Sequence, residues 1–319
     1  MKKAFKTIGK VLLGLLILIA VFLIVTTVYN QIMLRKNRAL YETPLGQLVG
    51  VDGHNMSIYT EGEGDHTLVF LSGWGTASPI LDFKPLYSRL SDDYKIVVVE
   101  KFGYGFSDIV DGERDMDTIL RQDREALEKC GIEAPYVLCA HSFSGYEATM
   151  WAQKYPDEAE AIVGLDMCTP NCRDIQALKD GDFMNSVGLG LAKFLRVAGL
   201  DRFPFHDESG TLTKEECAIY KEIICHKAVN QTMLNEGDID RLIALNDELN
   251  SAPLPTVPML LYASADFPDN PCWVSGMQAM ADASSDGTLI QLDCGHYVHY
   301  YESERISKDL KAFLAKLNG

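Results

Sequence analysis

The chain has 319 residues, of which 47% are hydrophobic and 23% charged, so it can build a large buried core and is too apolar for general disorder. Its net charge of −16 is unevenly distributed: residues 1–38 contain seven basic and no acidic residues, which leaves 22 basic and 45 acidic residues in the other 281. A body with this charge of −23 repels phosphate backbones, which excludes nucleic acid as an expected partner.

The N-terminal segment has the composition of a membrane span. Residues 11–34 contain no charged residue, and a helix of this length spans about 36 Å, more than a hydrocarbon core of about 30 Å. No small-x-small cleavage site follows the run. We therefore expect residues 1–38 to form a cytoplasmic stub, an uncleaved single-pass helix and a juxtamembrane segment; a cleaved signal peptide is the alternative. Four lysines before the span against three basic residues after it favour an extracytoplasmic body at the cell membrane.

Eight short runs after residue 45 have the pattern of strands, and most are continuous apolar stretches of the kind found in parallel strands covered on both faces. Helical patterns at 119–129, 146–154 and 303–317 lie between or after them. This alternation predicts an α/β protein with a mainly parallel sheet and helices on both faces. The predicted strands are 48–51, 56–59, 67–71, 96–99, 136–140, 161–165, 259–262 and 289–292.

One region interrupts the alternation. Between residues 169 and 250 only helical patterns occur, at 183–197, 214–226 and 239–249, and a proline-rich stretch then leads back to the strands. We expect a helical cap insertion over 169–255 between two parts of one core, 39–168 and 256–319. The segment from Phe183 to Leu200 is rich in Phe, Val, Leu and Gly, so it would line an acyl pocket or form a buried packing face.

The run Ala140-His141-Ser142-Phe143-Ser144-Gly145 joins a predicted strand to a predicted helix. A tight strand-turn-helix with small residues two before and two after its centre exposes the central side chain above the sheet. The run resembles the G-x-S-x-G nucleophile elbow of the α/β-hydrolase family, with Ala140 and Ser144 in place of the two glycines. A plain turn with Ser144 as a helix cap is the alternative.

Two further segments resemble the same family. Leu71-Ser72-Gly73-Trp74-Gly75 resembles its HG-x-G segment, and residues 100–107 resemble its D-x-x-G-x-G-x-S segment, with Glu in place of Asp. The resemblance implies an oxyanion hole made by the backbone N–H groups of Trp74 and Phe143.

His296 follows the last predicted strand and matches the family's catalytic-histidine loop; His299 is the competing base. Asp266, just after strand 259–262, is the expected acid, because Ser142, Asp266 and His296 then follow the family's chain order. Asp166, at the end of strand 161–165, is the alternative acid, and Asp269 is a third. The resemblance covers residues 45–318.

The expected function is a membrane-anchored serine hydrolase that cleaves an ester, or an amide, through an acyl-enzyme. The substrate would be a small-molecule ester or a short peptide. An aminopeptidase-like peptidase, with Glu215 and Glu216 of the insertion holding a substrate amine, is one alternative, and a non-catalytic binding module is another. Haloalkane dehalogenases of this family carry Asp where Ser142 stands. The cysteines lack metal-ligand spacing, so we expect neither a metal nor a cofactor.

Overall fold

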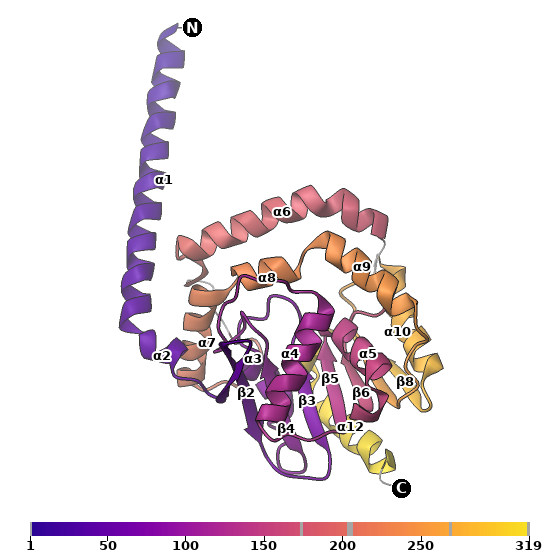
Figure 1. Cartoon of the computed structure of the whole chain (residues 1–319). Helices are drawn as coiled ribbons and strands as arrows, with labels where there is room; N and C mark the ends of the chain where they lie inside the picture. The colour runs from indigo at the N-terminus through magenta and orange to yellow at the C-terminus, as the bar shows by residue number, and fades with distance from the viewer. Residues whose placement is uncertain (1, 173–174, 203–206, 268–269, 318–319) are drawn as a thin grey trace.

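The computed structural model describes residues 2–172, 175–202, 207–267 and 270–317 (Figure 1). Its centre is an eight-stranded sheet in the order β1-β2-β4-β3-β5-β6-β7-β8. Strand β2 pairs antiparallel with both β1 and β4. All the other neighbouring strands, from β4 to β8 in this order, pair parallel. The strands are β1 (Gln47–Val51), β2 (His54–Glu61), β3 (Thr67–Leu71), β4 (Lys95–Glu100), β5 (Tyr136–His141), β6 (Ala159–Leu165), β7 (Met259–Ala263) and β8 (Gly287–Gln291).

Both faces of the sheet are buried, as the continuous apolar runs predict. In β3, Val69 and Leu71 face the side covered by α4 (Met116–Lys129), α5 (Ser144–Lys154) and α10 (Pro271–Ala283). Leu68 and Phe70 face the opposite side, with α3 (Pro79–Tyr87) and α12 (Ser303–Leu317). The predicted fold class is confirmed.

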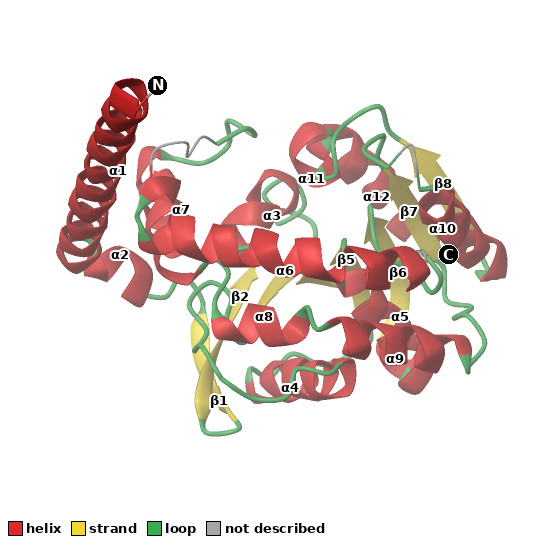
Figure 2. Ribbon diagram, turned by 90° about the horizontal axis from the view of Figure 1, so that it is seen from above, coloured by secondary structure: helices red, strands yellow, loops and turns green. Residues whose placement is uncertain are grey.

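The described elements between β6 and β7 are all helical, in the segment expected to form a cap. They are α6 (Ile175–Val197), the 3-10 turn η2 (Leu200–Arg202), α7 (Lys214–Lys227), α8 (Gln231–Glu236) and α9 (Ile239–Asn250). Figure 2 shows α6, α8 and α9 lying over the core when the molecule is seen from above. The described side chains of α6 start at Ser186, and Val187, Leu191 and Phe194 are about half exposed, so this part of α6 is not the expected buried face.

The N-terminal helix α1 (Lys2–Lys36) projects from the body as a single rod (Figure 1). Within the described residues, it is the one helix long and apolar enough to cross a membrane, with a mean hydropathy of 3.1 over its most apolar window between Phe5 and Lys36. Length and composition of this kind also fit a signal sequence. The short helix α2 (Arg38–Glu42) connects α1 to the sheet.

Candidate active site

The turn between β5 and α5 holds Ser142 in a left-handed conformation, with φ at 53°. Such a backbone is strained for a residue with a side chain and is kept only where the surroundings enforce it. Helix α5 and the chain after β6 approach so closely that a Cβ on Gly145 would lie 2.1 Å from the carbonyl oxygen of Cys168. Ser144 does not cap α5; its hydroxyl donates to the carbonyl oxygens of Leu71, at 2.6 Å, and His141. The geometry is that of a nucleophile elbow.

The glycine-rich segment after β3 lies directly against this elbow. A Cβ on Gly73 would be 2.8 Å from Cβ of Ser142, so only glycine fits there. Trp74 follows Gly73, and Phe143 stands at the N-terminus of α5, next to Ser142. The structure thus brings together the two segments expected to carry the nucleophile and the oxyanion donors.

The imidazole of His296 pairs with Asp166, since its Nδ1–H donates to Oδ2 of Asp166 at 2.6 Å. Asp166 is fully buried at the end of β6, with φ at 51°. Its carboxylate also accepts the backbone N–H of Ser264 at 2.9 Å, the Ser264 hydroxyl at 2.6 Å and the indole N–H of Trp273 at 2.8 Å. These donors hold the carboxylate in one orientation.

Asp266, the acid expected from the sequence, contacts a different part of the same residue. Its Oδ2 accepts the backbone N–H of His296 at 2.6 Å, and its side chain is exposed. The expected pairing of Asp266 with the imidazole is therefore wrong in this structure, and the alternative, Asp166, occupies that place. The reason is that β6 and β7 are neighbours in the sheet, so a carboxylate at the end of β6 also lies close to the loop of His296 and contacts its ring. Asp269 lies outside the described residues.

His299 is fully buried and has its own carboxylate partner. Its Nε2–H donates to Oδ2 of Asp82 in α3 at 2.9 Å. The ring of His141 lies between the two other imidazoles, with centroids 4.7 Å from His296 and 4.8 Å from His299. Burial, followed by the charges of His299 and His296, holds the pKa of His141 well below its usual value, so this ring stays neutral. Its Nε2–H donates to the carbonyl oxygen of His296 at 3.3 Å, which supports the loop that carries His296.

The cap helix α8 is joined to the glycine-rich segment by buried polar contacts. The indole N–H of Trp74 donates to the carbonyl oxygen of Met233 at 2.7 Å. The Tyr104 hydroxyl accepts the backbone N–H of Gly75 at 3.3 Å and donates to Oε2 of Glu236 at 2.9 Å. Lys101 completes the chain, with Nζ 3.0 Å from Oε1 of Glu236. A sequence search for catalytic motifs misses this network because its members come from segments about 30 and 130 residues apart.

Two more buried carboxyl groups, Asp123 in α4 and Glu147 in α5, lie beside Lys101. Burial, and then the neighbouring charge of Glu147, raises the pKa of Asp123 well above its usual range. Burial also raises the pKa of Glu147, against the lowering effect of Lys101. Burial lowers the pKa of Lys101, but the carboxylates of Glu236 and Glu147 outweigh burial and leave it raised. The lysine is therefore charged inside the core.

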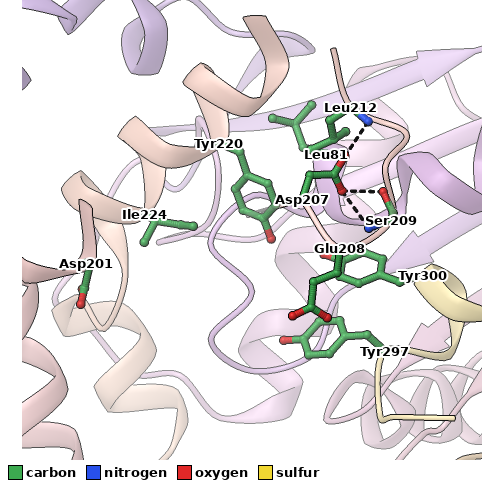
Figure 3. Close-up of a pocket in the computed structure, with 10 residues that line it drawn as sticks. All are labelled: Leu81, Asp201, Asp207, Glu208, Ser209, Leu212, Tyr220, Ile224, Tyr297 and Tyr300. Atoms are coloured by element: carbon green, nitrogen blue, oxygen red, sulfur yellow. Dashed lines mark hydrogen bonds between the residues drawn. The ribbon is translucent and has the colours of Figure 1, made fainter. Parts of the chain in front are cut away.

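A pocket of about 460 Å³ opens beside the histidine loop (Figure 3). Tyr297, the residue after His296, forms part of its wall, together with Tyr220 of α7 and Tyr300. The loop before α7 supplies Asp207, whose carboxylate accepts from Ser209 and from the backbone of Leu212 (Figure 3). The pocket thus combines aromatic faces with carboxylates. In the described part of the chain, no group of three or more His, Cys, Asp or Glu side chains is arranged to hold a metal ion.

Glu216 of the insertion has structural partners. It forms a capping box with Thr213 at the start of α7 and an ion pair with Lys84. A carboxylate engaged in this way is not free to hold a substrate amine.

The fold and the site agree with the comparison with known sequences. The sequence pattern of the alpha/beta hydrolase family matches residues 68–308. The chain belongs to this family. It is 33% identical over 333 residues to the uncharacterized protein YbdG of Bacillus subtilis, an alignment that covers 99% of this chain and 100% of that one. It is also 32% identical over 113 residues to the pimeloyl-[acyl-carrier protein] methyl ester esterase of Shewanella woodyi, which covers 35% of this α/β hydrolase and 39% of the esterase.

Solved structures show the same fold at low sequence identity. Cfl2 of Burkholderia cenocepacia is 18% identical with a TM-score of 0.64, covering 84% of this hydrolase and 94% of Cfl2. Est816, described as an N-acyl homoserine lactone degrading enzyme, is 19% identical with a TM-score of 0.59, covering 84% of this chain and 100% of Est816. The epoxide hydrolase of Bacillus megaterium is 16% identical with a TM-score of 0.61, covering 84% of this chain and 100% of the epoxide hydrolase.

Proposed function

We propose that this α/β hydrolase is a serine hydrolase with Ser142 as nucleophile, His296 as general base and Asp166 as the acid that orients the base. The observation that carries the proposal is the hydrogen bond between Nδ1 of His296 and the buried carboxylate of Asp166, together with the strained backbone of Ser142 in the turn after β5. A strained serine in such a turn and a carboxylate–imidazole pair are the parts required for nucleophilic catalysis.

The chemistry follows from the protonation of these groups. Because Nδ1–H of His296 is bound to Asp166, Nε2 carries the lone pair that accepts the proton of the Ser142 hydroxyl. The serine oxygen attacks the carbonyl carbon, and the N–H groups of Trp74 and Phe143 stabilise the oxyanion. The imidazolium then protonates the leaving group, and water releases the acyl group from Ser142 by the same steps.

A carboxylic ester is the proposed substrate class. The relative from Shewanella woodyi is named a methyl ester esterase, and Est816 is described as an N-acyl homoserine lactone degrading enzyme. A peptidase is favoured less, because Glu216 is engaged in the cap of α7 and with Lys84.

The proposal includes a membrane anchor. Helix α1 is exposed along most of its length, with only 6% of its most apolar window buried against the body, as in a span rather than a core helix. The body then lies outside the cytoplasm, joined to the cell membrane through residues 11–34.

Ester turnover tests the proposal. The purified chain is incubated with p-nitrophenyl esters of graded chain length and with aminoacyl-nitroanilides, beside Ser142→Ala. Faster turnover of esters than of anilides, lost in Ser142→Ala, is expected. Turnover that survives in Ser142→Ala would contradict the proposed nucleophile, and a preference for anilides would support the peptidase instead.

A further inference from the structure

The exposed apolar side chains of the body gather on one cap helix. Among the described residues after α1, nine large apolar side chains are exposed, and four of them lie on α6. Val187, Leu191, Phe194 and Val197 are 48% to 55% exposed and follow each other at spacings of four, three and three residues. At 3.6 residues per turn, this spacing places them on one face of the helix. We call these four residues the α6 stripe.

The opposite face of α6 is the one turned toward the body. Leu189, Ala192 and Arg196 lie on that side and are less exposed than the stripe, and Arg196 donates to the carbonyl oxygen of His226 in α7 at 2.8 Å. The helix is thus more apolar on its outer face than a surface helix in water normally is. Something other than water is expected to cover the stripe.

The C-terminal end of α6 is fixed to the proposed membrane helix. Asn30 of α1 is fully buried, and its amide donates to the carbonyl oxygen of Arg196 at 3.2 Å. Arg202, which follows α6, donates to Oδ1 of Asn30 at 2.6 Å. Gly199 presses against α1 so closely that a Cβ there would lie 2.5 Å from Cβ of Asn30. These contacts set the height of α6 along α1.

That height coincides with the expected edge of the bilayer. Lys10 is the last charged residue before the apolar run, and a hydrocarbon core of about 30 Å takes about 20 helical residues. Counted from Val11, the core ends at Asn30, where α6 is attached. Figure 1 shows α6 extending sideways from α1 as the outermost element of the body on the side toward which α1 projects, and Figure 2 shows it in front of the core from that side.

We infer that the α6 stripe lies in the interface of the same bilayer that α1 spans, so that the cap faces the membrane. This inference rests on the proposed anchor and goes beyond it by naming a second membrane-contacting surface. An apolar helix face at this depth binds lipid by burying its side chains below the headgroups. Lys193 flanks the stripe, and its ammonium reaches the phosphate level while its stem stays apolar.

Quenching of tryptophan fluorescence by brominated lipid tests the inference. The full chain carrying Phe194→Trp or Leu191→Trp is inserted into phosphatidylcholine vesicles, with and without lipid brominated near the headgroup end of its acyl chains. A zwitterionic lipid is used because the body's charge of −23 opposes anionic surfaces. The matched control is Ala315→Trp, an exposed position on α12 at the far end of the body (Figure 1). The wild type gives the background of its three native tryptophans.

We expect the brominated lipid to quench the added tryptophan at 194 or 191 at least twofold more than the one at 315. Equal quenching at all three positions, in a chain that stays in the vesicles at alkaline pH, would overturn the inference and leave the anchor intact. Tryptophan emission of Phe194→Trp that changes with the protein-to-lipid ratio but not with brominated lipid would also overturn the inference. A second copy of the chain, and not lipid, would then cover the stripe. Release of the chain by alkaline carbonate would overturn the inference together with the anchor. None of these results bears on Ser142, because the reactivity of Ser142 is measured separately.

Discussion

Asp166 and Asp266 both contact His296, but one binds its ring and the other its backbone. Asp166→Asn should therefore lower kcat by up to about 10⁴-fold, because the amide favours the wrong imidazole tautomer. Asp266→Asn should cost less than about tenfold, since an amide oxygen still accepts the backbone N–H. Ester turnover by the two variants under identical conditions decides between them. A dead Asp266→Asn beside an active Asp166→Asn would restore the assignment made from the sequence.

The buried carboxyls near Lys101 predict a pH effect on stability. The pKa of Asp123 is raised in the folded chain, so the folded state binds more protons than the unfolded state once the pH rises above about 4. The stabilisation that the protonated Asp123 gives to the folded state is complete below that pH. It is lost as the pH rises toward the raised pKa of Asp123. Asp123→Asn removes this titration and keeps the shape of the side chain.

Denaturant midpoints at pH 5 and pH 8 measure the effect. The stability of Asp123→Asn relative to the wild type should increase with pH. A difference that is the same at both pH values would show that Asp123 titrates alike in the folded and unfolded chains.

Most residues of the site were predictable from the sequence because motif residues stand at fixed places in the chain. Ser142 and His296 each follow a recognisable strand, and the structure brings both to one edge of the sheet. The choice between Asp166 and Asp266 was not predictable, since both follow strands that are neighbours in the sheet. The deciding donors, Ser264 and Trp273, come from separate segments whose direction the sequence does not give.

At the scale of elements, helix α8 contacts the glycine-rich segment that contains Trp74, one of the two proposed oxyanion donors. Tyr104→Phe removes the hydroxyl between Gly75 and Glu236, so kcat should fall by about tenfold to a hundredfold while KM changes little. Tyr136→Phe is the matched control, because it also deletes a buried hydroxyl, which donates to the carbonyl oxygen of Ile132. Tyr136 is the first residue of β5, so it lies at the end of the strand remote from Ser142.

Steady-state kinetics and thermal melts of both variants separate positioning from stability. Loss of kcat in Tyr104→Phe alone supports the coupling. Equal losses that follow the melting temperatures would reduce the network to a structural one.

The strands were easier to predict than several helices, for physical reasons. All eight strands lie within a few residues of the predicted runs, because strands covered on both faces need unbroken apolar sequence. Helix α3 contains Pro85 in its interior, so it shows no uninterrupted helical pattern. Helix α8 has six residues and is stabilised by its contacts with the core and by the Asn230 cap.

For the whole molecule, the contacts of α1 predict where the chain can be shortened. Arg202 and Glu222 form a buried ion pair. Arg202 donates to Oδ1 of Asn30, and the Asn37 amide donates to Oε1 of Glu222. A chain that starts at Arg38 loses both partners, whereas one that starts at Thr26 keeps them. The shorter chain should melt about 2–4 °C lower, as expected for a loss of about 1 kcal/mol in a domain of this size. Equal melting temperatures would show that water replaces these hydrogen bonds without loss.

The membrane anchor predicts how the full chain fractionates. The uncleaved protein should stay in the membrane pellet after alkaline carbonate, because a spanning helix resists extraction that removes peripheral proteins. Protease added to intact cells should digest the body if it lies outside the cytoplasm. Carbonate release of the full-length chain would contradict the anchor, and protection from protease would reverse its orientation.

Covalent labelling tests whether Ser142 is the catalytic nucleophile. We expect a fluorophosphonate probe to label the wild-type chain at Ser142, as identified by peptide mass spectrometry. Labelling should be lost in Ser142→Ala and strongly slowed in His296→Ala. His299→Ala should remain reactive, since the ring of His299 pairs with Asp82. A wild-type chain that folds and is not labelled, or a label found on another residue, would contradict the proposed catalytic serine.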